Sequence, residues 1–317
     1  MYELYLQQCC TEKITAVRKS MYYRIFVTES NLGFHSPKSD RCDLCEKFEV
    51  SKQTQTLTDD IKYEYDVHQT SKMNIREVRN EEKKNKDLPL LLFYLQNVIP
   101  TAHVNISPLF YLRKLNLYNL TAYYTPTKQV YCALWSENLS GRAGNDIASA
   151  FHKILTVLTE ENGITELITW SNSCIPQNRN SIISNTVLHF LKDNPQVKSV
   201  TMKYSLPGHS CVREVYSVHS NIEKAINKIN FYSPIGLIRI LKQVNPRHPY
   251  RVRKMRPDDF KDFQRTANLL IYKIVPFTIV EILKFSVNFK ASHDKLEPEN
   301  SSNIKFAETS IRGSKIY

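Results

Sequence analysis

Between residues 89 and 230 the chain carries three apolar, strand-like segments in close succession, followed by strands that alternate with helical patterns. Strands joined by short turns are typical of an antiparallel meander. After the third strand, apolar residues recur with the period of an amphipathic helix, and Gly163 supplies a C-cap signal for it. The expected strands lie at 90–98, 110–124, 130–135, 166–170 and 197–204, and the expected helices near 147–158, 181–191 and 218–229.

This order, βββαβαβα, is that of the ribonuclease H-like fold, so the sequence predicts an α/β domain with a mixed sheet. The flanking regions differ from it in composition, since they are more polar or more basic. The predicted organisation is a small helical CxxC module at 1–50, a long charged helix at 51–88, the ribonuclease H-like domain at 89–230, a basic α+β region at 231–290 and a disordered tail at 291–317.

Charge and glycine content narrow the classes of function. Forty-three Lys and Arg against thirty-one Asp and Glu give a net charge of +12, which attracts polyanions such as nucleic acid. A solvated basic surface explains the same charge equally well. Neither GxGxxG nor GxxxxGK[ST] occurs among the seven glycines, which argues against dinucleotide and P-loop chemistry.

The cellular location is predicted from apolar runs and cysteines. No apolar run reaches the roughly 18 residues of a membrane span, and the first residues, MYELYLQQCC, lack the pattern of a secretory signal. Seven cysteines are an odd number, which favours reduced thiols or a metal site over disulfides. We therefore expect an intracellular protein, nuclear or cytoplasmic, without a membrane partner.

The CxxC motif at Cys42 and Cys45 is a candidate for structural zinc. Tetrahedral zinc needs two further ligands. His68 and Cys9 are plausible completions, with Cys10 as the alternative to Cys9. Free thiols are the other interpretation of the motif.

A second candidate site is a basic run that resembles a phosphate-contacting strip, with Tyr250 as a stacking partner. A solvated turn is an equally good explanation. Arg179, in the turn after the fourth strand, is a further candidate for contact with a nucleic-acid backbone. The basic residues of the strip are Arg247, Arg251, Arg253, Lys254 and Arg256.

Several segments resemble a transposon-derived family of insects and other invertebrates, whose central domain is similar to a ribonuclease H-like transposase core. The resemblance covers nearly the whole chain except the tail. It rests on FYLQNVIPT at 93–101, WSE at 135–137, GRAGNDIAS at 141–149, WSNSCIPQNRN at 170–180, PGHSC at 207–211 and VHSNIE at 218–223, with weaker similarity at 1–5, 34–45 and 257–263.

The resemblance implies DNA as the partner and a site for two magnesium ions held by carboxylates. The family's acidic positions fall at Tyr94, Asn172 and Tyr216, and none of the three is an acid. We therefore expect the magnesium site to be lost and the protein to be an inactive transposase-like protein that retains some affinity for nucleic acid. His209 and His219 would line the rim of an intact pocket; here a structural role is the preferred interpretation, and Cys174 is taken as a pocket-wall residue.

Two alternatives remain open at this point. The fold can serve a host-recruited DNA-binding or protein-interaction module, in which the pocket is vestigial. More distantly, neighbouring acids can serve a metal-dependent nuclease with unusual ligands, and the candidates are Glu137, Asp146, Glu214 and Glu223. One carboxylate alone cannot assemble a two-metal site.

Overall fold

The computed structural model describes residues 2–29, 42–103, 113–268, 277, 280–287, 304–311 and 314–316. The chain divides into two compact units, Met1–Arg41 and Cys42–Tyr317. This division differs from the predicted module boundary at residue 50, because the CxxC motif belongs to the second unit. Most of the segment at 34–45, which resembles the family, lies outside the described residues.

The first unit is a pair of helices, α1 (Tyr2–Glu12) and α2 (Lys19–Glu29), held together by tyrosines. The rings of Tyr5 and Tyr22 have centroids 4.9 Å apart. The Tyr2 hydroxyl donates to the carbonyl of Val17 at 2.8 Å, and the Val17 amide donates to the Tyr5 hydroxyl at 3.0 Å. These contacts fix the turn between the two helices.

The second unit begins with α3 (Asp43–Gln53) and α4 (Asp59–Lys84), which form a helical hairpin. The Phe48 and Tyr65 rings stack between them with centroids 3.8 Å apart. Thr58 caps α4 by accepting a hydrogen bond from the Ile61 amide at 3.4 Å. The predicted charged helix is thus present, but it is not exposed throughout, because His68 and Arg79 on it are buried.

The strands form one mixed sheet in the order β10-β9-β8-β6-β5-β1-β3-β4-β7, with the short β2 paired to β3. β1, β3 and β4 are antiparallel neighbours, which is the predicted meander, whereas β5 and β6 run parallel to β1. The bounds are β1 Leu90–Leu95, β2 Ile99–Thr101, β3 Leu115–Tyr124, β4 Gln129–Ser136, β5 Glu166–Ser171, β6 Ser199–Tyr204, β7 Arg251–Lys254, β8 Val280–Val287, β9 Ile304–Ile311 and β10 Ser314–Ile316.

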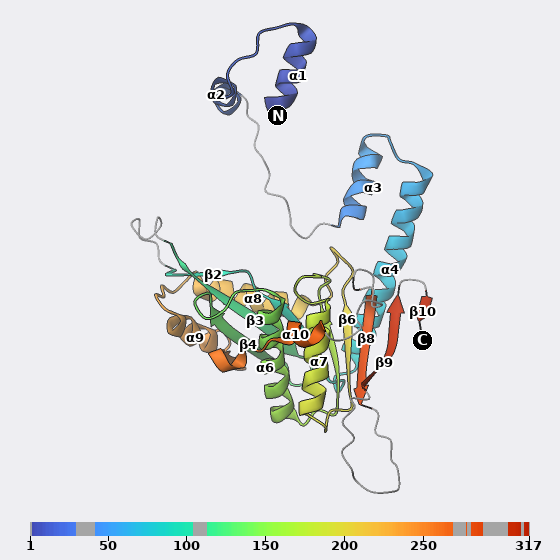
Figure 1. Ribbon diagram of the computed structural model, residues 1–317, viewed down its shortest axis with the longest axis vertical. Helices are drawn as coiled ribbons and strands as arrows, with labels where there is room; N and C mark the ends of the chain where they lie inside the picture. Colours follow the sequence, from blue (N-terminus) through green and yellow to red (C-terminus); the bar gives the residue numbers. More distant parts are fainter. Residues whose placement is uncertain are drawn as a thin grey trace. The chain divides into compact units, whose positions relative to one another are not determined.

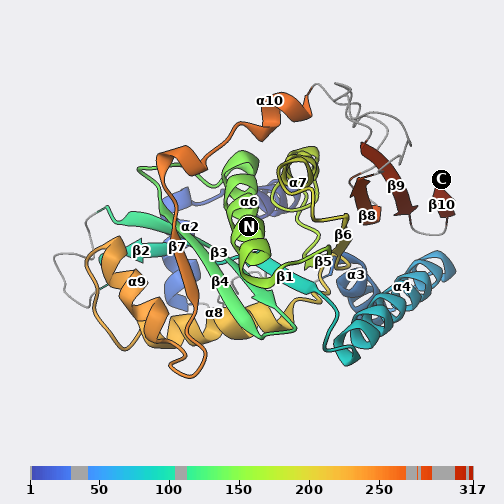
Figure 2. The ribbon, with the colours of Figure 1, turned by 90° about the horizontal axis from the view of Figure 1, so that it is seen from below.

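Helices cover both faces of the central strands (Figures 1 and 2). The sequence of β1 is almost uniformly apolar because both of its faces are buried. Leu91 and Phe93 belong to the core that packs against α6 and α7, while Leu90 and Leu92 belong to the core that includes the start of α8. A strand buried on both faces has no polar side. The helix bounds are α6 Gly144–Asn162, α7 Ser181–Asp193, α8 Arg213–Ile226, α9 Pro234–Gln243 and α10 Phe263–Ala267.

Helix ends follow local signals closely in α6. Gly163 adopts φ +60°, and its amide donates to the carbonyl of Thr159 at 2.9 Å, as the C-cap prediction requires. α8 instead begins at Arg213, several residues before its predicted start. The early start places Tyr216 within the first turns of α8.

The C-terminal region differs from the expected disordered tail. β9 pairs with β8, and β10 pairs with β9, so residues 304–311 and 314–316 extend the sheet beyond β6. Strand β8 supplies backbone hydrogen-bond partners to β9, and the polar sequence of the tail gives no sign of this pairing. Most of the apolar segment 269–280 and residues 291–303 lie outside the described residues. No helix in the described part of the chain is long and apolar enough to cross a membrane.

Candidate metal centre and the carboxyl end of the sheet

Two thiols and two imidazoles converge between α3, α4 and the turn after β6. The ligand atoms of Cys42, Cys45, His68 and His209 all lie within 4.8 Å of one another. Cys42 Sγ is 3.2 Å from His68 Nε2, and Cys45 Sγ is 3.4 Å from His209 Nε2. The two Nε2 atoms are 3.1 Å apart.

Three elements position these side chains. Cys42 immediately precedes α3, Cys45 lies in its first turn, and His68 lies on the face of α4 that packs against α3. His209 comes from a tight turn in which its amide donates to the carbonyl of Leu206 at 2.9 Å. The hairpin and the core domain therefore meet at this cluster.

Gly208 makes the close approach of this turn possible. Its φ is +72°, and a Cβ at this position would lie 2.6 Å from Cα of Cys42. Real Cβ atoms essentially never approach another heavy atom so closely. Only glycine therefore lets the turn rest on the backbone of Cys42.

The geometry fits a tetrahedral zinc ion. Zn–N and Zn–S bonds of about 2.0 and 2.3 Å place neighbouring ligand atoms roughly 3.3–3.8 Å apart in a tetrahedron. Three of the six separations between donor atoms are 3.1–3.4 Å, close to this range, and all six are within 4.8 Å. Burial lowers the pKa of His209 to about 4, so its imidazole is neutral near pH 7, as metal binding requires.

The cluster agrees with the predicted zinc site in three of its four members. Cys42, Cys45 and His68 are brought together, and the fourth position is taken by His209, for which the sequence favours a structural role. The cluster found among the described residues includes neither Cys9, which is buried on α1, nor Cys10, which is exposed on it. No spacing signal points to His209, because it lies far along the chain from the CxxC motif.

The positions at which the resemblance would place catalytic acids lie at and near the carboxyl ends of β1 and β5. The two strands are parallel neighbours with Leu92 opposite Trp170. Tyr94 lies two residues after Leu92 at the end of β1, and Asn172 lies two residues after Trp170, directly beyond β5. On α8, Tyr216 lies against Tyr94, with ring centroids 5.3 Å apart and the rings edge to face.

Asn172 has a structural role in the turn that connects β5 to α7. Its side-chain oxygen accepts hydrogen bonds from the Asn178 side chain and from the Cys174 amide. Asn180 then caps α7 by accepting from the Ile183 amide at 3.0 Å. The side chains of Asn172, Asn178 and Asn180 therefore hold this turn through hydrogen bonds from neutral amides.

His219 fills the space beside the two tyrosines. Its ring lies 6.1 Å from that of Tyr94 and 6.5 Å from that of Tyr216, measured between centroids. Burial lowers the pKa of His219 to about 4, so it is neutral. These contacts agree with a structural role for His219.

Three of the four neighbouring acids are engaged in other contacts. Glu214 accepts from Arg79 at 3.0 Å and pairs with Lys83 at 3.3 Å. Asp146 accepts from the Ala143 amide at 2.7 Å and so secures the start of α6. Glu137 pairs with Arg113 and Asn116, and Glu223 is exposed on α8.

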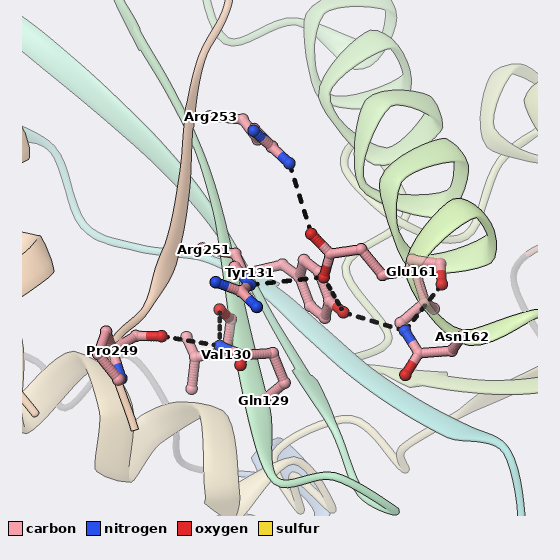
Figure 3. Close-up of polar contacts among 9 residues, drawn as sticks. Gln129, Val130, Tyr131, Glu161, Asn162, Pro249, Arg251 and Arg253 are labelled. Carbon is pink, nitrogen blue, oxygen red and sulfur yellow. Dashed lines mark hydrogen bonds and ion pairs between the residues drawn. The ribbon is translucent and has the colours of Figure 1, made fainter. Parts of the chain in front are cut away.

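Three residues of the basic strip, Arg251, Arg253 and Lys254, lie on strand β7 of the sheet. Its arginines on β7, Arg251 and Arg253, pair with Glu161 of α6 at 3.5 and 3.4 Å (Figure 3). Tyr250 is only 5% exposed, so it cannot stack on a base as expected. The side chains of Arg247, Lys254 and Arg256 are exposed.

Arg179 differs from its predicted role. It is 5% exposed, and its guanidinium carbon lies 6.0 Å from the centroid of the Tyr204 ring. A buried guanidinium packed on an aromatic ring contributes to the fold and does not reach a bound strand. The turn after β5 therefore offers no arginine to a ligand.

The sequence matches no protein-family model and no curated protein. The transposon-derived origin therefore remains an expectation from the motifs.

Proposed function

We propose that this protein is a transposon-derived, ribonuclease H-like protein that has lost catalysis, binds nucleic acid and holds a structural zinc ion. The observation that carries the proposal is that Tyr94 and Asn172 lie at the carboxyl ends of the neighbouring parallel strands β1 and β5, with the ring of Tyr216 5.3 Å from that of Tyr94. Each occupies a position where the family resemblance requires a carboxylate.

The strand order supports the ribonuclease H-like assignment. The central strands lie side by side in the order β6-β5-β1-β3-β4. Strands β1, β3 and β4 form the antiparallel meander, and β5 and β6, which come later in the chain, run parallel to β1. The connections through α6 and α7 separate the parallel strands. Fold similarity alone does not establish an activity, so the argument for lost catalysis rests on the side chains.

The side chains at the three positions are unsuited to magnesium. Mg²⁺ takes oxygen ligands, mainly carboxylates, and a two-metal site needs several of them. Two phenols and one amide supply no negative charge near pH 7. Glu214, the acid nearest in sequence to Tyr216, is already neutralised by Arg79 and Lys83.

The zinc ion would bind through Cys42, Cys45, His68 and His209. Bound there, it supplies structural cross-linking, because all four ligands come from the protein and no position is left for a substrate. The α3–α4 hairpin contributes three ligands, and the turn after β6 contributes one. The hairpin would thus be fastened to the sheet domain.

Restoration of the acids tests the lost site. The triple variant Tyr94→Asp, Asn172→Asp, Tyr216→Asp should gain Mn²⁺ binding by calorimetry, whereas the wild-type protein should bind none at this end of the sheet. The variant Tyr94→Asn, Asn172→Asp, Tyr216→Asn is the control, because it makes matched size changes but adds only one carboxylate. A folded triple variant without Mn²⁺ binding would contradict the assignment of these positions.

Strand cleavage and salt dependence test the remaining parts. The wild-type protein should show no Mg²⁺- or Mn²⁺-dependent cleavage of DNA, and its DNA affinity should fall steeply as salt rises. Cleavage that disappears in Glu214→Gln would overturn the inactive assignment. An affinity that does not change with salt would remove nucleic acid as the partner.

A further inference from the structure

A cavity of about 270 Å³ lies where the C-terminal half of α4 meets the start of α8. This volume is slightly below the roughly 300–1,000 Å³ of pockets for small organic ligands, so the cavity suits a compact group. Four of the side chains that line it are basic and one is acidic. They are Arg76, Arg79, Lys83, Arg213 and Glu214.

Arg79 is the fixed element of this cavity. It is 5% exposed, and its Nη2 donates to Glu214 Oε1 at 3.0 Å. Its Nε and Nη1 are also buried, and neither has a hydrogen-bond partner among the described residues. Buried donors normally have a hydrogen-bond partner, because an unpaired one, above all a charged one, destabilises the folded protein.

The cavity has a marked excess of positive charge. Glu214 is shared between Arg79 and Lys83, whose ammonium lies 3.3 Å from it. Arg76 and Arg213 are exposed and form no ion pair with any described residue. The start of α8 adds the partial positive charge of a helix N-terminus.

We propose that this cavity binds a phosphate group of a nucleic-acid strand. The inference rests on the proposed function and names the cavity as a place where the protein contacts the nucleic-acid strand. Arginine side chains bind phosphate with paired hydrogen bonds, and the buried Arg79 would hold its ligand with little loss of side-chain freedom. The Lys83 side chain is 64% exposed, so a strand can pass the mouth of the cavity while one phosphate enters.

The candidate zinc site is close in the chain to both walls of this cavity, one formed by α4 and the other by residues 210–214. Arg76 lies on α4 two turns beyond His68, and Ser210 of the lining directly follows His209. A metal ion bound there would therefore tie both walls together. The basic strip on β7 is a separate region and does not contribute to the lining.

Anisotropy titrations of the full zinc-loaded chain with a fluorescent single-stranded DNA 20-mer test the proposal. The double variant Arg76→Gln, Arg213→Gln should bind at least about tenfold more weakly, and its slope of log affinity against log salt should fall by about one. The control is Lys62→Gln, Lys224→Gln, which removes the same charge from exposed positions on the same two helices. It should bind within about twofold of the wild type if the cavity is the contact point.

The possible outcomes separate the cavity from the function. Equal losses in the two double variants, with wild-type binding intact, would overturn the cavity assignment and leave the proposed function in place. Titration with inorganic phosphate, followed by calorimetry, distinguishes the source of the ligand. Phosphate binding that the arginine variant weakens, without any DNA binding by the wild type, would overturn the nucleic-acid assignment of the cavity.

Discussion

The Nε2 atoms of His68 and His209 lie 3.1 Å apart, although 141 positions separate the two residues in the chain. A thiol sulfur lies within 3.4 Å of each of these nitrogens. Four soft or borderline donors aimed at one point are the ligand set that zinc prefers. The relationship links a helical hairpin to a turn of the sheet domain through a single shared centre.

Zinc analysis of the purified chain should give about one equivalent per molecule. His209→Ala should release zinc to a chelator far more readily than the wild type and lower the melting temperature, because three ligands remain and metal binding contributes to folding. Cys9→Ser should retain zinc as the wild type does. Equal zinc loss in Cys9→Ser would restore Cys9 as a ligand.

Replacement of Gly208 by alanine should disrupt the metal centre. The new Cβ would overlap the backbone of Cys42, so the turn that carries His209 must move away. Gly163→Ala is the matched control, since φ is also positive there but nothing lies within 4 Å of the new Cβ. We expect Gly163→Ala to cost about 1 kcal/mol with zinc retained, and Gly208→Ala to cost more and to weaken zinc binding. Similar effects of the two substitutions would contradict the close packing of Gly208 on Cys42.

Removal of the Glu161 charge tests the basic strip. Glu161→Gln weakens the attraction that holds Arg251 and Arg253 and leaves both cations available to a polyanion (Figure 3). If the strip contacts DNA, affinity should rise severalfold and the salt dependence should steepen, while stability falls by less than about 1 kcal/mol because the pairs are partly exposed. Glu160→Gln, an exposed neighbour on α6, changes the net charge equally. The same gain in both variants would show that net charge alone is responsible.

The stability of the protein should decrease as the pH falls below about 6.5, in part because of His152. Burial lowers the pKa of His152 to about 4, whereas the unfolded chain titrates at 6.5. Between these values the unfolded state binds the proton more tightly, so stability present at neutral pH is lost on acidification. His152→Gln should lose about 2 kcal/mol less than the wild type between pH 7 and pH 5 in urea unfolding with zinc present. Identical losses in both proteins would contradict a neutral, buried His152.

The parts of the fold that local patterns determine were predictable. Alternate residues of β1 pack on opposite faces, and Gly163 ends α6, because burial and backbone conformation at these places depend on neighbouring residues in the chain. The basic neighbours of Tyr250 predict a surface position for it. It is buried because the segment leading into β7 packs on the sheet, a tertiary effect that composition does not reveal.

The candidate metal site shows the same limit. The CxxC spacing and the position of His68 on a helix face predict three ligands. His209 could not be chosen in advance, because nothing in the local sequence states that the turn after β6 returns to α3. The closeness of Gly208 to Cys42 likewise becomes evident only in three dimensions.

The separation of the ligands along the chain has a consequence for biosynthesis. Cys42, Cys45 and His68 leave the ribosome together, while His209 follows only after β1 to β6 have been made. A zinc ion captured early would keep an exchangeable coordination position until the central strands assemble and deliver the last imidazole. Tight binding of zinc would thus require a chain that is completely synthesised and folded. A truncated or misfolded chain would lose its zinc to competing ligands.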